Sequence, residues 1–297
     1  MKKIKYILYC ASIVLFSTTI FAQQQGITTL YKEQMNFVNP SFVGIDNETN
    51  ASVGYRKQWL GVNNAPETQT YVFGSAIGKN LGIGISASND KTFIEKQTNL
   101  GIDFSYKLVV SSDTDLYLGV KAGGDFYEVN TAGLNTFNPV SDPSLVSFSS
   151  FRPNFGVGAT LKKENFYVSA SIPRILNTVR ARNEEAQNYV ATNKAHMYLS
   201  AAYDYDLNTA SNMVLKPYFM LRYVNSAPVS IDYNLSLSFF ESFEIGAMYR
   251  SSGAVGGLTK IKVLDSLFFG YSYEVSTIAT LANRFNTHEF LLKYKFN

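Results

Sequence analysis

Hydrophobic and polar residues alternate with a period of two through much of this chain. In residues 99–108 the odd positions hold polar or small side chains, whereas the even positions hold Leu, Ile, Phe, Tyr and Leu. The same alternation recurs in residues 116–125 and 231–239, and more briefly in residues 243–249 and 290–296. Because successive side chains of a β-strand point to opposite faces, each segment is expected to form a strand with one apolar and one polar face.

The pattern predicts an all-β fold of about fourteen strands, an even number as in most bacterial outer-membrane barrels. No repeat or linker divides the chain into further domains. The expected strands cover residues 49–59, 67–77, 79–88, 95–109, 114–128, 151–162, 165–173, 194–206, 212–224, 228–238, 241–250, 253–263, 266–276 and 286–297. Segments 67–77 and 253–263 alternate poorly, and Pro217 inside a strand predicts a β-bulge.

Alternation by itself fits either a soluble β-sandwich or a transmembrane antiparallel β-barrel. Strands of about 10 residues match the length that a tilted strand needs to cross a bilayer. The polar face is rich in Gly, Ser and charged residues, as a barrel lumen would be, and the apolar face often ends in an aromatic residue. The barrel is therefore favoured. The aromatic residues expected at the membrane interfaces are Trp59, Tyr106, Tyr205, Tyr223, Tyr249, Tyr273 and Tyr294.

The connections between the expected strands alternate between short and long. Short turns on one rim and long loops on the other are typical of outer-membrane barrels, with the long loops outside the cell. An even number of strands then places both ends of the barrel on the periplasmic rim. The longest loops are expected at residues 129–150 and 174–193.

The first residues have the pattern of a targeting segment. Three lysines precede an apolar stretch that ends at Ala22, which predicts a secretory signal peptide over residues 1–22. Residues 23–48 are then an N-terminal periplasmic or lumenal segment, and residues 49–297 form the barrel. The expected location is the outer membrane of a Gram-negative bacterium. Because three of the 26 basic residues lie in the signal peptide, the remainder is neutral, with 23 basic and 23 acidic residues, and is no candidate for nucleic-acid binding.

Catalytic and metal-binding motifs are missing from the sequence. It contains no GxSxG, HExxH or phosphate-binding glycine loop, and its two histidines, His196 and His288, lie far apart in sequence. No cofactor and no enzymatic activity are expected. Charges of both signs on the polar face more often form a satisfied interior network than a selective pore. The charged residues expected on the polar face are Asp103, Lys107, Lys121, Asp125, Asp204, Lys216, Arg222, Asp232, Glu244, Arg250, Glu274 and Glu289.

A series of short motifs, in a fixed order from about residue 37 to the C-terminus, resembles the PorP/SprF family of outer-membrane proteins associated with the type IX secretion system of Bacteroidota. The residues that carry the resemblance are Asn39, Pro40, Gly44, Tyr55, Arg56, Gln58, Trp59, Gly61, Pro66, Arg222, Tyr223, Pro228, Asn234, Tyr249, Arg250, Gly270, Tyr271, Tyr273, His288 and Glu289. A structural interpretation of the first motifs is a tight turn into the first strand with Trp59 at the membrane interface.

The resemblance implies a non-enzymatic role in type IX protein secretion or gliding motility. The implied partners are type IX secretion components, a large secreted adhesin-like surface protein, or both, besides outer-membrane lipid. Two alternatives stay open: a transport channel for small hydrophobic or nutrient molecules, and an outer-membrane enzyme. Planar-bilayer conductance separates a plugged barrel from a channel.

The two longest loops are candidates for partner binding. The first contains more apolar side chains than a solvated loop needs, and the second is rich in charged residues that suit a polar rim. The alternative is that both loops fold back and plug the barrel. The candidate partner residues are Phe137, Leu145, Phe148, Arg180 and Arg182.

Overall fold

The computed structural model describes residues 28–131, 147–183, 188–208, 212–225, 227–278 and 286–296. The expected signal peptide, residues 1–22, lies outside the described residues. Among the helices of the described part of the chain, none is long and apolar enough to cross a membrane.

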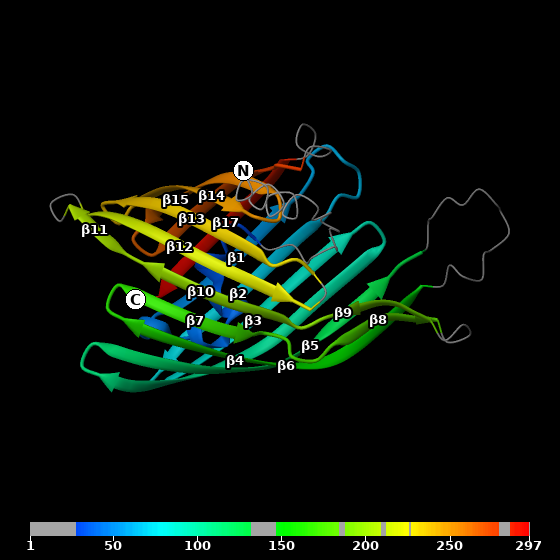
Figure 1. Cartoon of the computed structure of the whole chain (residues 1–297), viewed down its shortest axis with the longest axis horizontal. Coiled ribbons are helices and arrows are strands. Elements are labelled where there is room, and N and C mark those ends of the chain that lie inside the picture. Colours follow the sequence, from blue (N-terminus) through cyan, green and yellow to red (C-terminus); the bar gives the residue numbers. More distant parts are fainter. Residues whose placement is uncertain are drawn as a thin grey trace, which may run out of the picture.

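The described strands form a closed antiparallel β-barrel whose wall has fourteen strand positions, which we call staves (Figure 1). Neighbouring staves follow one another in sequence, and one stave consists of two short pieces, β10 and β11, that both pair with β12. The strands are β1 (Thr49–Lys57), β2 (Glu67–Ile77), β3 (Leu81–Thr92), β4 (Glu95–Ser111), β5 (Thr114–Val129), β6 (Phe148–Lys163), β7 (Phe166–Ile172), β8 (Thr178–Asn183), β9 (Asn188–Asn193), β10 (His196–Tyr203), β11 (Tyr205–Asn208), β12 (Met213–Val224), β13 (Ser230–Phe239), β14 (Phe243–Arg250), β15 (Ala254–Leu264), β16 (Leu267–Ser276) and β17 (Asn286–Phe296).

The barrel closes between its first and last strands, as the sequence predicts. β1 pairs with β17 along its whole length, from Thr49 opposite Phe296 to Lys57 opposite His288. The two weakly alternating segments are also strands, because β2 pairs with β1 and β3, and β15 pairs with β14 and β16. The predicted count and closure are therefore confirmed.

The two faces of the wall differ as the period-two pattern predicts. In β13, Leu235 points outwards and is 52% exposed, whereas the next residue, Ser236, points into the lumen and is 5% exposed. The same contrast holds in β5 between exposed Val120 and buried Lys121. Apolar side chains thus face the bilayer, and polar side chains are buried inside the barrel.

The bulge predicted at Pro217 is not present; instead the ladder is interrupted opposite Pro217 without a change of register. The ladder between β10 and β12 ends with Ala202 opposite Tyr218, and the ladder between β11 and β12 resumes with Tyr205 opposite Leu215. Proline has no N–H group to donate to a ladder, so the break falls opposite Pro217 while β12 itself continues.

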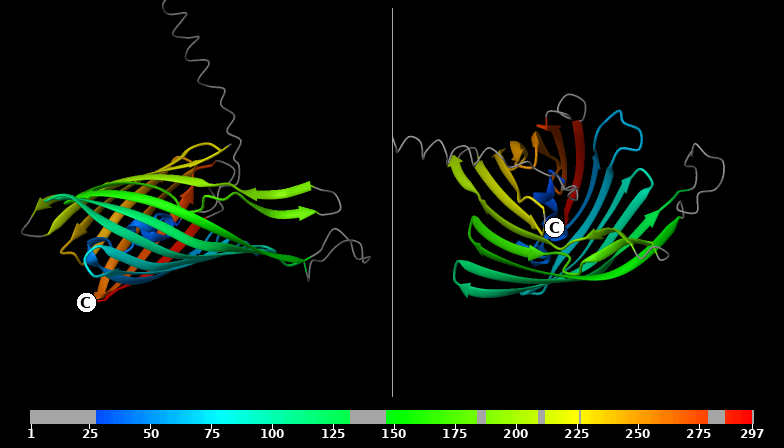
Figure 2. Two further views of the ribbon diagram at one scale, coloured as in Figure 1. Left: turned by 90° about the horizontal axis from the view of Figure 1, so that it is seen from below. Right: turned by 45° about the vertical axis from the view of Figure 1, so that its right-hand side comes forward.

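The prediction of a plain loop at residues 174–193 is incomplete. Residues 178–193 contain β8 and β9, which pair with each other in a separate two-stranded sheet that projects beyond the wall (Figure 2). Each of the two strands, TVRARN and NYVATN, has only six residues, too few for a period-two pattern to stand out from a charged loop. The loop expected at 129–150 is also shorter, because β5 extends to Val129 and β6 begins at Phe148.

The two rims of the barrel differ in the length of their connections. The short-turn rim carries two- to three-residue turns such as those after β4 and β13, and the latter holds Phe240 and Glu241 at φ 52° and 55°. Positive φ at both central residues suits the twist of a tight hairpin. The long-loop rim carries the connections after β1, β5, β7 and β16. The start of β1 and the end of β17 both lie at the short-turn rim.

Candidate functional site

The segment before β1 runs through the inside of the barrel. We call residues 28–48 the lumen segment; it contains the short helices η1 (Tyr31–Gln34), α2 (Met35–Val38), η2 (Pro40–Phe42) and η3 (Ile45–Asn47). At its start Thr29 bonds to Glu289, near the long-loop rim. At its end Glu48 pairs with Lys295 at 2.6 Å, near the short-turn rim. Both views in Figure 2 place this segment inside the curved wall.

Near the long-loop rim, buried wall charges hold the first residues of the lumen segment. Glu289 accepts hydrogen bonds from the backbone N–H groups of Thr29 and Leu30, at 2.6 and 2.9 Å. The Thr29 hydroxyl donates to Glu274 at 2.9 Å and accepts from Arg56 at 3.2 Å. Because these carboxylates are buried, such bonds are needed to compensate for lost hydration.

The same carboxylates are neutralised by two arginines, so that the charges form one network. Arg56 pairs with Glu274 at 2.9 Å and with Glu289 at 3.1 Å, and all three side chains are at most 10% exposed. Arg250 pairs with Asp232 at 2.9 Å and with Glu274 at 3.2 Å. We call these five residues the arginine cluster. It ties β1, β13, β14, β16 and β17 to one another and to the lumen segment.

A second ion-pair group holds η1 from the other side. Glu33 pairs with Lys260 at 2.5 Å and with Lys293 at 3.2 Å, and Lys260 also pairs with Glu244 at 3.1 Å. Burial raises the pKa of the Glu33 carboxyl, but the two lysines outweigh that effect and hold the pKa well below its usual range. Glu33 therefore stays ionised inside the barrel and anchors η1 to β15 and β17.

Lys121 binds the backbone carbonyl groups of α2. Its ammonium group donates to the carbonyl oxygens of Asn36 and Phe37 at 3.2 and 3.1 Å and to the Ser86 hydroxyl at 2.7 Å. It also pairs with Asp103 at 3.2 Å. A cation that binds the last carbonyl groups of a helix satisfies acceptors that have no partner within the helix.

Close packing against wall glycines fixes the part of the lumen segment that lies nearer the short-turn rim. The Asn39 side chain accepts from the backbone N–H and the hydroxyl of Ser41, at 3.0 and 2.7 Å, and that hydroxyl lies 2.6 Å from the Thr160 hydroxyl. Asn39 and Ser41 are fully buried. A β-carbon at Gly119 would overlap the Ser41 backbone, and one at Gly158 would overlap the Asn39 side chain. Only glycine at these wall positions lets the segment approach so closely.

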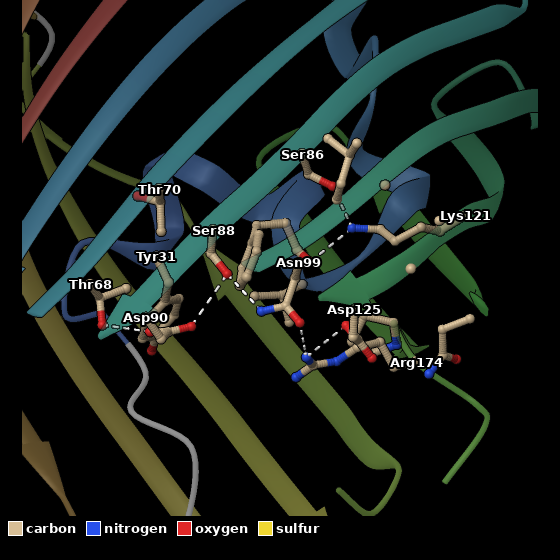
Figure 3. A pocket seen from close by; sticks show the side chains of 18 of the residues that line it. Tyr31, Thr68, Thr70, Ser86, Ser88, Asp90, Asn99, Lys121, Asp125 and Arg174 are labelled. Atoms are coloured by element: carbon tan, nitrogen blue, oxygen red, sulfur yellow. Dashed lines mark hydrogen bonds and ion pairs between the residues drawn. The ribbon is translucent and has the colours of Figure 1, made fainter. Parts of the chain in front are cut away.

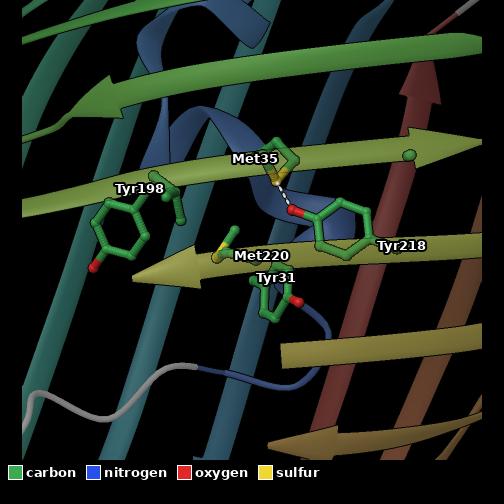
Figure 4. Packing of buried hydrophobic residues seen from close by; sticks show 7 residues of the cluster. Tyr31, Met35, Tyr198, Tyr218 and Met220 are labelled. Carbon is green, nitrogen blue, oxygen red and sulfur yellow. Dashed lines mark hydrogen bonds between the residues drawn. The ribbon is translucent and has the colours of Figure 1, made fainter. Parts of the chain in front are cut away.

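Aromatic and sulfur-containing side chains form the apolar core between the lumen segment and the wall. Tyr31 and Met35 of the segment pack against Tyr198, Tyr218 and Met220 of β10 and β12 (Figure 4). The Tyr218 hydroxyl donates to the Met35 sulfur at 3.4 Å, and the Tyr31 and Tyr218 rings lie 5.3 Å apart. The segment is therefore packed like a protein interior, in addition to being bound by ion pairs.

Between the lumen segment and the long-loop rim lies a small polar pocket (Figure 3). Arg174 donates to Asn99 at 2.7 Å and pairs with Asp125 at 3.5 Å, and Asn99 donates to Ser88 at 2.9 Å. The pocket leaves about 70 Å³ for the centres of water-sized molecules. One water needs about 10–15 Å³ of such space, so the pocket holds only a few waters. The lumen segment thus fills most of the lumen at this level, and a second space of about 240 Å³ remains nearer the short-turn rim, beside Glu33, Lys216 and Lys260.

The residues that carry the family resemblance fall into several places. Arg56, Arg250 and Glu289 belong to the arginine cluster. Asn39, Pro40 and Gly44 lie in the part of the lumen segment nearer the short-turn rim, where Gly44 has φ 68°. The motif is thus a packed element in the lumen that ends at Gly44, five positions before Thr49, the first residue of β1.

Further motif residues touch the lumen segment from the wall. Asn234 donates to the Tyr31 hydroxyl at 2.8 Å, and a β-carbon at Gly270 would lie 3.2 Å from Leu30. Arg222 is buried in the lumen, 4% exposed.

The remaining motif residues lie outside these contacts. The Tyr271 hydroxyl lies 2.9 Å from the His288 ring, against which Tyr273 packs edge-on at 5.2 Å. The others occupy the outward-facing wall or the connections of the long-loop rim: Tyr55, Gln58, Trp59, Gly61, Pro66, Tyr223, Pro228 and Tyr249.

Among the charged residues of the site, Glu33, Lys260 and Lys293 are not predicted by the sequence. Lys293 lies on the polar face of the last strand, and that periodicity is a usable signal. Lys260 lies in a segment that alternates poorly, and Glu33 precedes the barrel, so no pattern indicates that they meet.

The candidate partner loops are only partly described. Phe137 and Leu145 lie outside the described residues, and Arg180 and Arg182 belong to β8, of which the backbone alone is described. Phe148 begins β6 and packs against Tyr127 with ring centroids 5.8 Å apart. Among the described residues no group of three or more His, Cys, Asp or Glu side chains is arranged to hold a metal ion.

Comparison with known proteins places the chain among outer-membrane barrels. The model of a family described as "Type IX secretion system membrane protein PorP/SprF" matches residues 20–294. No curated protein matches the chain.

Several solved structures are similar in fold. The outer-membrane protein Omp33 of Acinetobacter baumannii has a TM-score of 0.50 and 12% identity, covering 84% of this chain and 99% of its own. The CymD monoaromatic hydrocarbon channel has a TM-score of 0.52 and 10% identity, covering 89% and 91%. A TodX ΔS2S3 mutant monoaromatic hydrocarbon channel has a TM-score of 0.54 and 8% identity, covering 88% and 94%. The chain is thus an outer-membrane β-barrel.

Proposed function

Because the chain belongs to the PorP/SprF family of type IX secretion system membrane proteins, we propose that it is a non-enzymatic barrel that supports the secretion or surface anchoring of large secreted adhesin-like proteins. The observation that carries this proposal is the filled lumen. The lumen segment is locked to the wall by the arginine cluster, by Glu33 and by Lys121. A barrel closed in this way suits a rigid scaffold in the membrane better than a passage for small molecules.

In this proposal the long-loop rim faces the cell surface and carries the partner-binding elements. Two long connections leave this rim, residues 130–147 and residues 173–195, and the second contains the hairpin of β8 and β9. The hairpin projects beyond the wall in the left view of Figure 2. Backbone that leaves the wall cannot lie in hydrocarbon unpaired, so a projecting hairpin stands in water, where a soluble partner can reach it.

The short-turn rim would then meet the periplasmic components of the secretion machinery. Its turns are short, and the end of the lumen segment, at the Glu48–Lys295 pair, lies there as well. A periplasmic partner could therefore contact both the wall and the segment that fills it.

The proposal is tested by separating barrel folding from partner retention. Residues 133–145 are replaced by a short Gly/Ser linker in the chromosomal gene, and a matched variant carries the same linker in the turn 240–242 on the opposite rim. If the long-loop rim holds the secreted protein, the first variant releases a surface protein into the medium, whereas the second retains it. Both must keep a heat-modifiable barrel in the outer membrane. Normal surface retention by the first variant would remove this loop from the function.

Deletion of the whole gene tests the broader claim. Surface and medium fractions are compared by quantitative proteomics with those of the parent strain. Loss or mislocalisation of one or more large secreted proteins supports the proposal, and unchanged secretion and surface display would contradict it.

A further inference from the structure

The outer wall of the barrel contains an apolar groove that the functions above do not use. We call it the outer groove; it lies over β7, β10, β12, β13 and β14 and has a volume of about 600 Å³. Its lining includes Phe166 and Tyr203 at one end and Tyr233 and Tyr249 at the other. The exposed side chains around it belong to the outward-facing, membrane-facing class.

The groove follows from the sizes of the side chains in two neighbouring rows. Pro217, Leu235 and Ala247 stand side by side on β12, β13 and β14 and form a low floor. In the next row Phe219, Tyr233 and Tyr249 form a tall aromatic wall. The rings of Phe219 and Tyr233 are 5.5 Å apart and those of Tyr233 and Tyr249 are 6.4 Å apart, so the wall is continuous.

A break in the β-ladder lies at one end of the groove. The pairing between the β10/β11 stave and β12 is interrupted opposite Pro217, between the pairs Ala202–Tyr218 and Tyr205–Leu215. Tyr203 and Phe166, which pair across β10 and β7, close this end of the groove.

The surroundings of the groove determine what fills it. It opens onto the bilayer, and an apolar cavity stays dry. An unfilled void would lose the dispersion contacts of its lining. A flexible hydrocarbon chain that lies along the aromatic wall restores these contacts, and membrane lipid supplies such chains at high concentration.

We propose that the outer groove is a binding site for one acyl chain of an outer-membrane glycerophospholipid, held for longer than the lipids around the rest of the barrel. Rows of paired residues cross the strands, and the site extends from Tyr249, next to the last residue of β14, to Phe166, the first residue of β7. The tyrosine hydroxyl groups at the two ends suit the polar boundary of the bilayer.

The floor of the groove also borders the core of the lumen. Ala202 and Tyr218 line the groove from behind, and both belong to the cluster that packs against Tyr31 and Met35 of the lumen segment. The bound chain therefore supports the wall at the break in the ladder and, through it, the packing of the lumen segment.

Native mass spectrometry of the full-length protein, purified from outer membranes in a mild detergent, tests this proposal. At collision energies that remove detergent, the wild type should keep one phospholipid. Ala247→Phe fills the floor and should reduce the lipid-bound fraction at least tenfold. The control Ala122→Phe adds the same ring to the exposed, membrane-facing side of β5, away from the groove, and should keep the lipid.

A titration of delipidated protein with 1-palmitoyl-2-oleoyl-phosphatidylethanolamine should restore one bound lipid to the wild type and to Ala122→Phe, but not to Ala247→Phe. If Ala247→Phe is not heat-modifiable, Pro217→Ile, which also fills the floor, takes its place. A wild type without retained lipid, or equal retention by the groove and control variants, would overturn the proposal. Retention of lipopolysaccharide in place of phospholipid would overturn the assignment of the lipid.

Discussion

Replacement of Arg56 by Met should destabilise the barrel because it leaves two buried carboxylates without their shared cation. Arg56 is 4% exposed in its side chain and pairs with Glu274 and Glu289 at 2.9 and 3.1 Å. Removal of one partner of a buried ion pair costs about 3–5 kcal/mol. Glu289 keeps its two backbone donors and Glu274 keeps Arg250, so a loss near the lower limit, about 3 kcal/mol, is expected.

A double-mutant cycle separates the loss of the ion pair from the loss of packing. Arg56→Met combined with Glu289→Gln removes the uncompensated charge and should recover about half of the lost stability or more. The control is Lys57→Met at the next position. Lys57 pairs with Glu67 at 2.8 Å, but its side chain is 36% exposed, so its loss should cost about 0–1 kcal/mol.

Urea unfolding in lipid vesicles gives the free energies for this cycle. The sequence contains one tryptophan, Trp59, three residues from Arg56, so its fluorescence reports on this part of the barrel. Equal stabilities of Arg56→Met and Lys57→Met would refute the assignment of the arginine cluster as a structural lock. Additive effects of Arg56→Met and Glu289→Gln would refute the direct coupling of the two residues.

Three further predictions concern the wall and the lumen segment. Val120→Arg on the bilayer face of β5 should destabilise the barrel by about 2–4 kcal/mol in vesicle unfolding, and an unchanged stability would refute the assignment of the faces. Gly119→Ala should cost about 1–3 kcal/mol in the same assay because a β-carbon there overlaps the Ser41 backbone, whereas Gly257→Ala, with no atom closer than 3.8 Å, should be nearly neutral. The folded-state pKa of Glu33 is lowered, so its stabilising effect is present above about pH 4.3 and is lost as the pH falls further. Proteolysis of the lumen segment should therefore increase below that pH in the wild type, whereas Glu33→Gln should show no such increase.

The wall could be predicted from the sequence because each strand carries its own information. Period-two alternation identifies both faces of β5 and β13 without knowledge of their neighbours. The bulge predicted at Pro217 was wrong, because the ladder is interrupted there with its register unchanged. The hairpin of β8 and β9 escaped the same test, since each of its strands has only six residues, too few to stand out from a charged loop. Local pattern was thus sufficient only where the bilayer imposes two different faces.

The contacts of the lumen segment could not be predicted in this way. Residues 28–48 have no regular period, and their partners lie far along the chain, such as Lys260 for Glu33 and Thr160 for Ser41. The mixed charges on the polar face did predict a satisfied interior network, but not that an N-terminal carboxylate completes it. The glycines that admit the segment, Gly119 and Gly158, carry no side-chain signal, and their role depends on close approach in three dimensions.

Single-channel recording in planar bilayers tests most directly that the barrel is closed by its own lumen segment. The purified full-length protein should give no large, steady ohmic currents, because the lumen segment is packed and ion-paired along the lumen. A variant that lacks residues 28–47 but retains a heat-modifiable barrel should open a steady conductance under the same conditions. Large, steady currents from the full-length protein would contradict the account and favour a channel.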